Sequence, residues 1–152
     1  MEKIDKALQT KVWQRVQNRE MPEMPDLGKD NLKPLLLIAR ENQQVYQTLS
    51  RQLSGKEGEK IRKLQMETRN CIACVKGICC VWGEPVKVPQ LPVEKEPVKR
   101  ALMKCYHREN KLCAEWEYRA SDPEYGAVYS RLAQQAREHC VTVMEVLGDL
   151  EK

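Results

Sequence analysis

The chain has 152 residues, a length typical of one domain with a sizeable core. Hydrophobic residues make up 41% and charged residues 32%, which indicates a globular protein rather than a disordered one. The net charge of +4 comes from basic residues scattered among acidic ones without a dense Lys/Arg tract, so nucleic-acid binding is not expected. The longest apolar run, residues 35–39, is too short to cross a bilayer, so no membrane insertion is expected.

Residues 1–33 are predicted to form an N-terminal helix and linker. Apolar side chains recur at four-residue spacing within residues 2–19, as on one face of an amphipathic helix: Ile4, Leu8, Val12 and Val16. Two prolines and a glycine between residues 21 and 28 end this helix. Its face is expected to pack on the rest of the chain or on a second copy. The segment lacks the hydrophobic core of a signal peptide, so a cytoplasmic location is expected.

A first helical hairpin is predicted over residues 34–81. Pro34 suits a helix start because a proline there loses no hydrogen bond, and this helix is expected to run to about residue 53. Ser54 and Glu57 have the spacing of a capping box, which predicts a second helix running to about residue 80. The short turn between the two helices favours an antiparallel pair.

Four prolines within residues 82–97 predict an extended connection. About 15 such residues span roughly 45 Å, more than the roughly 36 Å of a helix of about 24 residues, so the connection can run the length of a bundle. A second hairpin is predicted over residues 98–152. Its first helix is expected to end near residue 120. A second capping signal, Ser121 to Glu124 with Pro123 at the first helical position, predicts a last helix that runs to about residue 150.

The two hairpins share a short motif. The tripeptide Arg-Glu-Asn at residues 40–42 recurs at residues 108–110, and a capped turn and a long helix follow each copy. Each of these long helices carries a cysteine near its middle, Cys71 or Cys140. The pattern indicates an internal duplication, with the hairpins as the two halves of one bundle.

Each of the four helices directs one ionisable side chain into or beside its apolar stripe: Glu41, Glu67, Glu109 and His139. In the first helix the predicted stripe consists of Leu37, Ile38, Val45, Thr48 and Leu49. In the third it consists of Leu102, Cys105, Tyr106, Leu112, Cys113 and Trp116. Burying such groups is costly unless they pair, accept hydrogen bonds or bind a cation. The four residues are therefore candidates for one shared site.

This arrangement resembles the rubrerythrin and ferritin-like di-iron carboxylate family, in which each half supplies one helix with Glu and the next with Glu-x-x-His. Glu41 and Glu109 match the glutamates of the first and third helices. Residues 67–70, Glu-Thr-Arg-Asn, match the first Glu-x-x-His with Asn70 in place of histidine. Residues 136–139, Ala-Arg-Glu-His, match the second with alanine in place of glutamate.

The resemblance covers residues 34–150 and implies an all-α, ferritin-like four-helix bundle with one long crossover. It implies that Glu41, Glu67, Glu109 and His139 bind one or two iron or manganese ions, with zinc as a further candidate where ligands are few. Gln135 or Glu138 would contribute if the register of the last helix shifts. The implied activity is peroxide or oxygen handling, as a peroxidase or ferroxidase that protects a cytoplasm from oxidants. A homodimer is expected, and electrons would come from a separate donor.

Two alternatives remain open. In the first, the chain is a non-catalytic bundle used in assembly or protein interaction, and hydrogen bonds from residues such as Tyr46 or Tyr106 satisfy the old site. In the second, the four thiols of Cys71, Cys74, Cys79 and Cys80 serve as a redox or metal sensor, with the last two expected to be the most exposed and oxidisable. Cysteines that simply pack as small apolar residues are the plainer interpretation of the same pattern.

Overall fold

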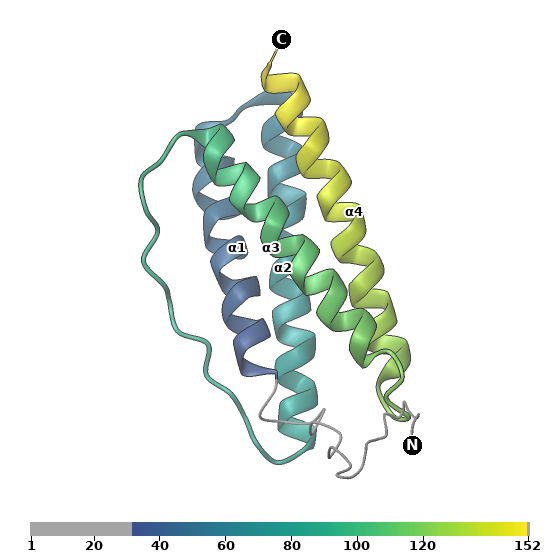
Figure 1. The fold of residues 1–152 in the computed structure, drawn as a ribbon. Helices are drawn as coiled ribbons and strands as arrows, with labels where there is room; N and C mark the ends of the chain where they lie inside the picture. The colour runs from purple at the N-terminus through teal and green to yellow at the C-terminus, as the bar shows by residue number, and fades with distance from the viewer. Residues whose placement is uncertain (1–31, 152) are drawn as a thin grey trace, which may run out of the picture. The chain divides into compact units, whose positions relative to one another are not determined.

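The computed structural model describes residues 32–151 and, within them, four helices and no strand (Figure 1). The helices are α1 (Lys33–Gln52), α2 (Gly55–Val81), α3 (Val98–Arg119) and α4 (Gly126–Leu150). The predicted all-α bundle is confirmed, and most helix ends agree with the predictions to within two residues. The helix predicted over residues 2–19 lies outside the described residues. None of the four helices is long and apolar enough to cross a membrane.

The helices pair as two hairpins joined by one long crossover. α1 packs on α2 and α3 on α4, while α1 also lies beside α3 and α2 beside α4. The extended connection of residues 82–97 runs alongside α1 from the end of α2 to the start of α3 (Figure 1). The amide of Gln44 holds it there, because its Nε2 donates to the Leu91 carbonyl at 2.5 Å and its Oε1 accepts from the Leu91 N–H at 2.8 Å. The predicted crossover is therefore present and anchored to α1.

Both hairpin turns bring a glycine against a backbone carbonyl. A Cβ on Gly58 would lie 2.5 Å from the oxygen of Leu53, and a Cβ on Gly126 would lie 2.4 Å from the oxygen of Ala120. Contacts this short exclude any larger residue unless the backbone moves. The two halves thus share a turn requirement in addition to the repeated tripeptide.

The predicted capping boxes are wrong at both turns. Ser54 makes no side-chain hydrogen bond to the start of α2. At the second turn α4 begins at Gly126, so Pro123 precedes the helix. Asp122 instead closes a local turn, with its Oδ2 accepting from the N–H groups of Glu124 and Tyr125 at 3.0 and 2.6 Å. A short acidic side chain that bonds its own following backbone competes with helix initiation, which accounts for the later start.

The core consists of two apolar clusters separated by a polar layer. One cluster contains the stacked rings of Trp116 and Tyr129, and the other contains Ile61 and Val146. Between them lie buried polar residues from all four helices, among them Asn42, Thr68, Glu109 and His139. In α3, for example, Glu109 lies between Cys105 of one cluster and Leu112 of the other. The candidate site is therefore a cross-section of the bundle.

Candidate functional site: a histidine between two carboxylates

His139 lies at the centre of the polar layer, with a carboxylate at each ring nitrogen. Its Nδ1 is 3.1 Å from Glu109 Oε2, and its Nε2 is 2.9 Å from Glu67 Oε1. His139 and Glu109 are buried, whereas the side chain of Glu67 is 32% exposed. Three of the four predicted site residues, from α2, α3 and α4, thus meet within hydrogen-bonding distance.

The remaining helix, α1, contributes a tyrosine to this centre. The hydroxyl of Tyr46 in α1 donates to Glu109 Oε2 at 2.8 Å, the same oxygen that faces His139. Tyr46 is fully buried. Burial, together with the charge of Glu109, raises the pKa of Tyr46, so the phenol keeps its proton and acts as a donor. The hydrogen bond between Tyr46 and a core glutamate, one of the alternatives drawn from the sequence, is present.

Glu41 lies apart from the centre. Its side chain is 45% exposed, and its Oε2 is 3.1 Å from NH2 of Arg108 in α3. The same guanidinium donates through NH1 to Asn42 Oδ1 at 3.2 Å, and Asn42 Nδ2 donates to the Cys105 carbonyl at 3.3 Å. The inward position next to Glu41 is therefore occupied by Asn42, and Glu41 forms a separate ion pair at the edge of the bundle.

The prediction of which side of the first helix faces the core is wrong. The buried face of α1 contains Leu35, Leu36, Ala39, Asn42 and Tyr46, and it shares Val45 and Leu49 with the prediction. Leu37, Ile38 and Thr48 are only partly buried. Adjacent residues of a helix point about 100° apart, so this change of one position turns Glu41 away from the core. The stripe predicted for α3 is confirmed, since only Tyr106 in it is less than fully buried.

The other positions singled out in the sequence do not join the centre. Asn70 is exposed on α2. Glu138 is exposed and accepts from Gln134 Nε2 at 3.3 Å, within the same helix. Gln135 lies nearer, because it lines a void of about 10 Å³ together with Glu109 and His139. A void of this size matches about one water molecule.

Solvent approaches the centre from one side. A groove of about 240 Å³ is lined by residues of α2 and α4, among them Glu67, Glu138 and His139. Lys63 lies 3.9 Å from Glu67 Oε2. The chain of contacts from Glu67 through His139 to Glu109 and Tyr46 therefore starts at this groove and ends in the closed core.

The two carboxylates favour the charged form of the imidazole. Burial, the largest single influence, lowers the pKa of His139, but the hydrogen bonds and charges of Glu109 and Glu67 together outweigh it and raise the pKa above 6.5. An imidazolium carries an N–H on both ring nitrogens, so it can donate to both carboxylates at once. A neutral imidazole has one N–H and would leave its other nitrogen facing a carboxylate with no proton between them.

The donors present do not fit the implied metal site. Glu67 and Glu109 lie at opposite nitrogens of His139, so each nitrogen has a single carboxylate oxygen beside it, and Glu41 is engaged with Arg108. A site for iron or manganese needs several donors directed at one point. Residues 32–151 contain no group of three or more His, Cys, Asp or Glu side chains arranged to hold a metal ion. The geometry fits a hydrogen-bonded centre.

The cysteines of α2 differ in exposure. Cys80 is exposed, as predicted, whereas Cys79 is buried, so the prediction is wrong for Cys79. Cys79 packs in the same apolar cluster as Trp116. Burial, with the charges of Glu109 and Cys74, raises the pKa of Cys71 to about 12, which leaves it protonated and a poor nucleophile at neutral pH. Packing is thus the role of Cys71 and Cys79, which lie in or against this cluster.

Comparison of the chain with protein-family models, with curated proteins and with solved structures finds no match. Function is therefore inferred from the geometry of residues 32–151 and from the motifs of the sequence.

Proposed function

We propose that the chain is a ferritin-like bundle that works without a metal, as a non-catalytic protein of assembly or interaction. The single observation that carries this proposal is the occupation of both ring nitrogens of His139 by Glu67 and Glu109. The partners that a metal ion would provide in the core are provided here by the protein itself.

The energetics of the polar layer support this interpretation. A buried charge is tolerated when it is paired and its remaining hydrogen-bonding capacity is used. Glu109 Oε2 faces both His139 and the Tyr46 hydroxyl, and the imidazolium balances the charge of the buried Glu109. Glu67, the second carboxylate, is partly exposed and has Lys63 3.9 Å from its Oε2. Such a satisfied network needs no ion, and it favours one register of the four helices over alternatives that would break its bonds.

The ferritin-like part of the proposal rests on architecture and motif together. Two hairpins and a single crossover along the bundle match the family pattern, and the repeated Arg-Glu-Asn tripeptide indicates that the two hairpins are related halves. The ligand positions are incomplete, because Asn70 and Ala136 replace a histidine and a glutamate. A family member that has lost its metal would retain this mixture of kept architecture and lost ligands.

Metal content is the direct test. The purified chain is loaded anaerobically with Fe(II) or Mn(II), desalted, and analysed for bound metal beside Glu109→Gln and the matched control Glu41→Gln. We expect well under about 0.1 ion per chain in all three proteins, because no donor set closes around an ion. One or two ions per native chain, lost in Glu109→Gln and kept in Glu41→Gln, would overturn the proposal. That result would favour an iron- or manganese-dependent peroxidase or ferroxidase served by a separate electron donor.

A further inference from the structure

One outer face of the α3–α4 hairpin carries apolar side chains. Met103 on α3 and Val141 and Met144 on α4 are each about half exposed. Single exposed apolar residues are ordinary on a protein surface, but a contiguous group of them marks an interaction site. Whether these three form one group depends on the register of the two helices and on the sides to which the residues point.

The register of α3 against α4 follows from three side-chain contacts. Arg137 donates to a carboxylate oxygen of Glu117, and Cys140 Sγ donates to Asn110 Oδ1 at 3.4 Å. The helices are antiparallel, so moving toward the start of α3 means moving toward the end of α4. The Cys140 contact places Met103 level with residue 147, and the Arg137 contact, which two long side chains make, places it nearer to residue 151. A second contact of Cys140 Sγ, to the Tyr106 carbonyl at 3.9 Å, places Met103 level with residue 143. Met103 and Met144 are therefore neighbours in height along the bundle.

The two α4 residues point to the α3 side. Val141 and Met144 follow Arg137 by four and seven residues, so they lie on the side of α4 that holds Arg137 against α3. Glu145, which pairs with Lys60 of α2 at 3.3 Å, lies about 100° further round α4 than Met144, so Met144 is turned away from α2 and Val141 points outward between the two. Val141 and Met144 thus belong to the outer α3–α4 surface.

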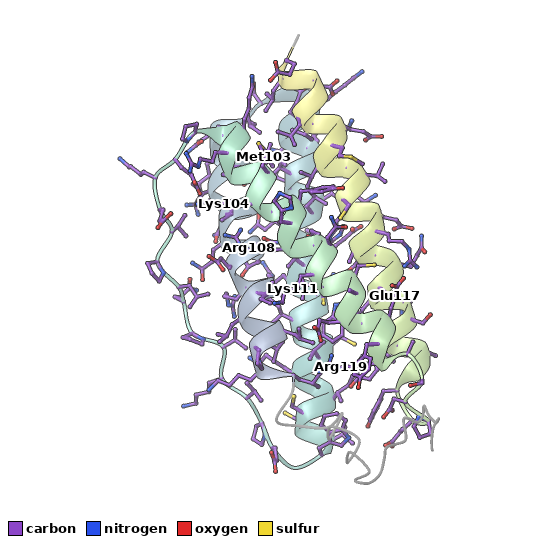
Figure 2. The ribbon with its side chains drawn as sticks, in the orientation of Figure 1. Met103, Lys104, Arg108, Lys111, Glu117 and Arg119 are labelled. Atoms are coloured by element: carbon purple, nitrogen blue, oxygen red, sulfur yellow. The ribbon has the colours of Figure 1, made fainter. Side chains whose placement is uncertain are left out.

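Met103 points to the same surface. Figure 2 shows Lys104 and Arg108 on the crossover side of α3, whereas Met103 and Glu117 lie toward α4. The ion pair of Lys104 with Glu96 of the crossover, at 3.0 Å, agrees with this orientation. The three apolar side chains therefore share one face, here called the α3–α4 face.

Ion pairs stand at both ends of this face. Lys99 pairs with Glu151 at one end, and Arg137 pairs with Glu117 at the other. In the register above, both pairs lie about eight residues, or about 12 Å, from the level midway between Val141 and Met144. Each end thus carries one cation and one anion at the same distance from the apolar centre.

We propose that the α3–α4 face binds a second copy of the chain in an antiparallel two-fold contact; this names the partner of the assembly role proposed above. A two-fold axis through the centre brings the apolar side chains of both copies together. It also places the Lys99–Glu151 end of one copy over the Glu117–Arg137 end of the other. Lys99 then meets Glu117 of the partner, and Arg137 meets Glu151 of the partner.

Two other long sides of the bundle are less suited to a copy of this chain. The crossover covers the side between α1 and α3, as its bonds to Gln44 and Lys104 show. The side between α2 and α4 carries charged pairs such as Lys60 with Glu145. The α3–α4 face spans about 27 Å by about 20 Å, on the order of 500 Å² per copy, which is near the lower limit for a specific interface. The dimer is therefore expected to dissociate in the micromolar range.

The test is sedimentation velocity of the full chain from about 1 to about 200 μM, bracketing a micromolar dissociation constant. Met144→Glu is compared with Met66→Glu, a matched change at an exposed methionine on α2. Native chain and Met66→Glu should dimerise alike, whereas Met144→Glu should weaken the dimer at least about tenfold with unchanged helix content. A native chain that stays monomeric at about 200 μM, or a Met144→Glu chain that dimerises like the native one, overturns the proposal.

A charge swap tests the two-fold geometry. Lys99→Glu should weaken the dimer, and adding Glu117→Lys should restore it, because the two positions meet only between copies and lie about 27 Å apart within one chain. A double variant that dimerises no better than the single variant would exclude this pairing. The outcome is independent of metal content: bound metal in a dimer sensitive to Met144→Glu would refute the proposed function and leave the interface standing. A metal-free dimer insensitive to Met144→Glu would do the reverse.

Discussion

The two hairpins of the bundle bury different residues of the same Arg-Glu-Asn tripeptide. In α3 the glutamate, Glu109, is buried, and the following asparagine is exposed. In α1 the glutamate, Glu41, is half-exposed, and the following asparagine, Asn42, is fully buried. The inward-facing position of the tripeptide is thus shifted by one residue between the two hairpins. In the first hairpin the neutral amide of Asn42 lies in the core, where the second hairpin has the carboxylate of Glu109.

The partners available to each glutamate explain the difference. Glu109 faces His139 from the neighbouring helix of its own hairpin and Tyr46 from the other hairpin. The position on α2 that matches His139 is Asn70, which is exposed. A carboxylate turned inward at position 41 would have no imidazole beside it, and burying an unpaired charge is far more costly than exposing it to Arg108. A carboxylate therefore enters the core only where a proton donor is already in place.

The largest effect is expected for removal of the shared partner, His139. His139→Ala leaves Glu109 buried without its counter-charge, so the free energy of unfolding should fall by about 3–5 kcal/mol. His107→Ala, at an exposed position of α3, is the control and should change it by less than about 0.5 kcal/mol. Urea unfolding followed by circular dichroism measures both. Equal effects at the two histidines would mean that the polar layer contributes nothing specific.

The repeated glutamates give the most direct test of the asymmetry. Glu109→Gln removes the charge that faces His139 and should cost about 2–3 kcal/mol of unfolding free energy. Glu41→Gln removes one half of a partly exposed ion pair and should cost no more than about 0.5–1 kcal/mol. The same urea titrations measure the pair. If Glu41→Gln were the more destabilising of the two, the assignment of the buried and exposed halves would be inverted.

The sequence predicts the bundle well, because prolines and short turns mark most helix ends and the α3 stripe has a single good phase. Glu67, Glu109 and His139 could be singled out for the same reason, since each lies in or beside such a stripe. The phase of α1 could not be determined in this way. Four consecutive apolar residues, 35–38, fit two helical faces equally well, and only the contacts of Asn42 with Arg108 and Cys105 distinguish them.

Two buried tyrosines allow a comparison between a hydroxyl that has a hydrogen-bond partner and one that has none among the described residues. Tyr46→Phe removes the hydroxyl that donates to Glu109 and should lower the free energy of unfolding by about 1.5–2 kcal/mol. The Tyr129 hydroxyl is buried beside Trp116 and has no hydrogen-bond partner among the described residues. Tyr129→Phe should therefore change the stability by less than about 0.5 kcal/mol or increase it slightly. Thermal unfolding of both variants checks this, and a larger loss for Tyr129→Phe would show that its hydroxyl has a partner after all.

The smallest expected effect is a pH dependence produced by His139. Hydrogen bonds and charges from Glu109 and Glu67 outweigh the opposing effect of burial and raise the folded-state pKa of His139 above 6.5, the ordinary value that applies to the unfolded chain. Between the two values the folded chain holds a proton that the unfolded chain has released, so raising the pH favours unfolding. The stabilisation is fully present below pH 6.5 and is lost as the pH rises through the folded-state value. The slope can reach about 1.4 kcal/mol per pH unit.

Urea unfolding of the native chain and of His139→Gln at several values from pH 6 to pH 8 isolates this contribution. The raised thiol pKa values, such as the value of about 11 for Cys140, add the same slope to both proteins near pH 8, so their contribution cancels in the difference. The stability difference between the native chain and His139→Gln should shrink as the pH rises. A difference that stays constant would mean that the pKa of His139 is the same in the folded and the unfolded chain, and a difference that grows with pH would mean that His139 is neutral in the folded chain. The imidazole would then donate to only one of its two carboxylates, and the link that it forms between the hairpins would be a single hydrogen bond.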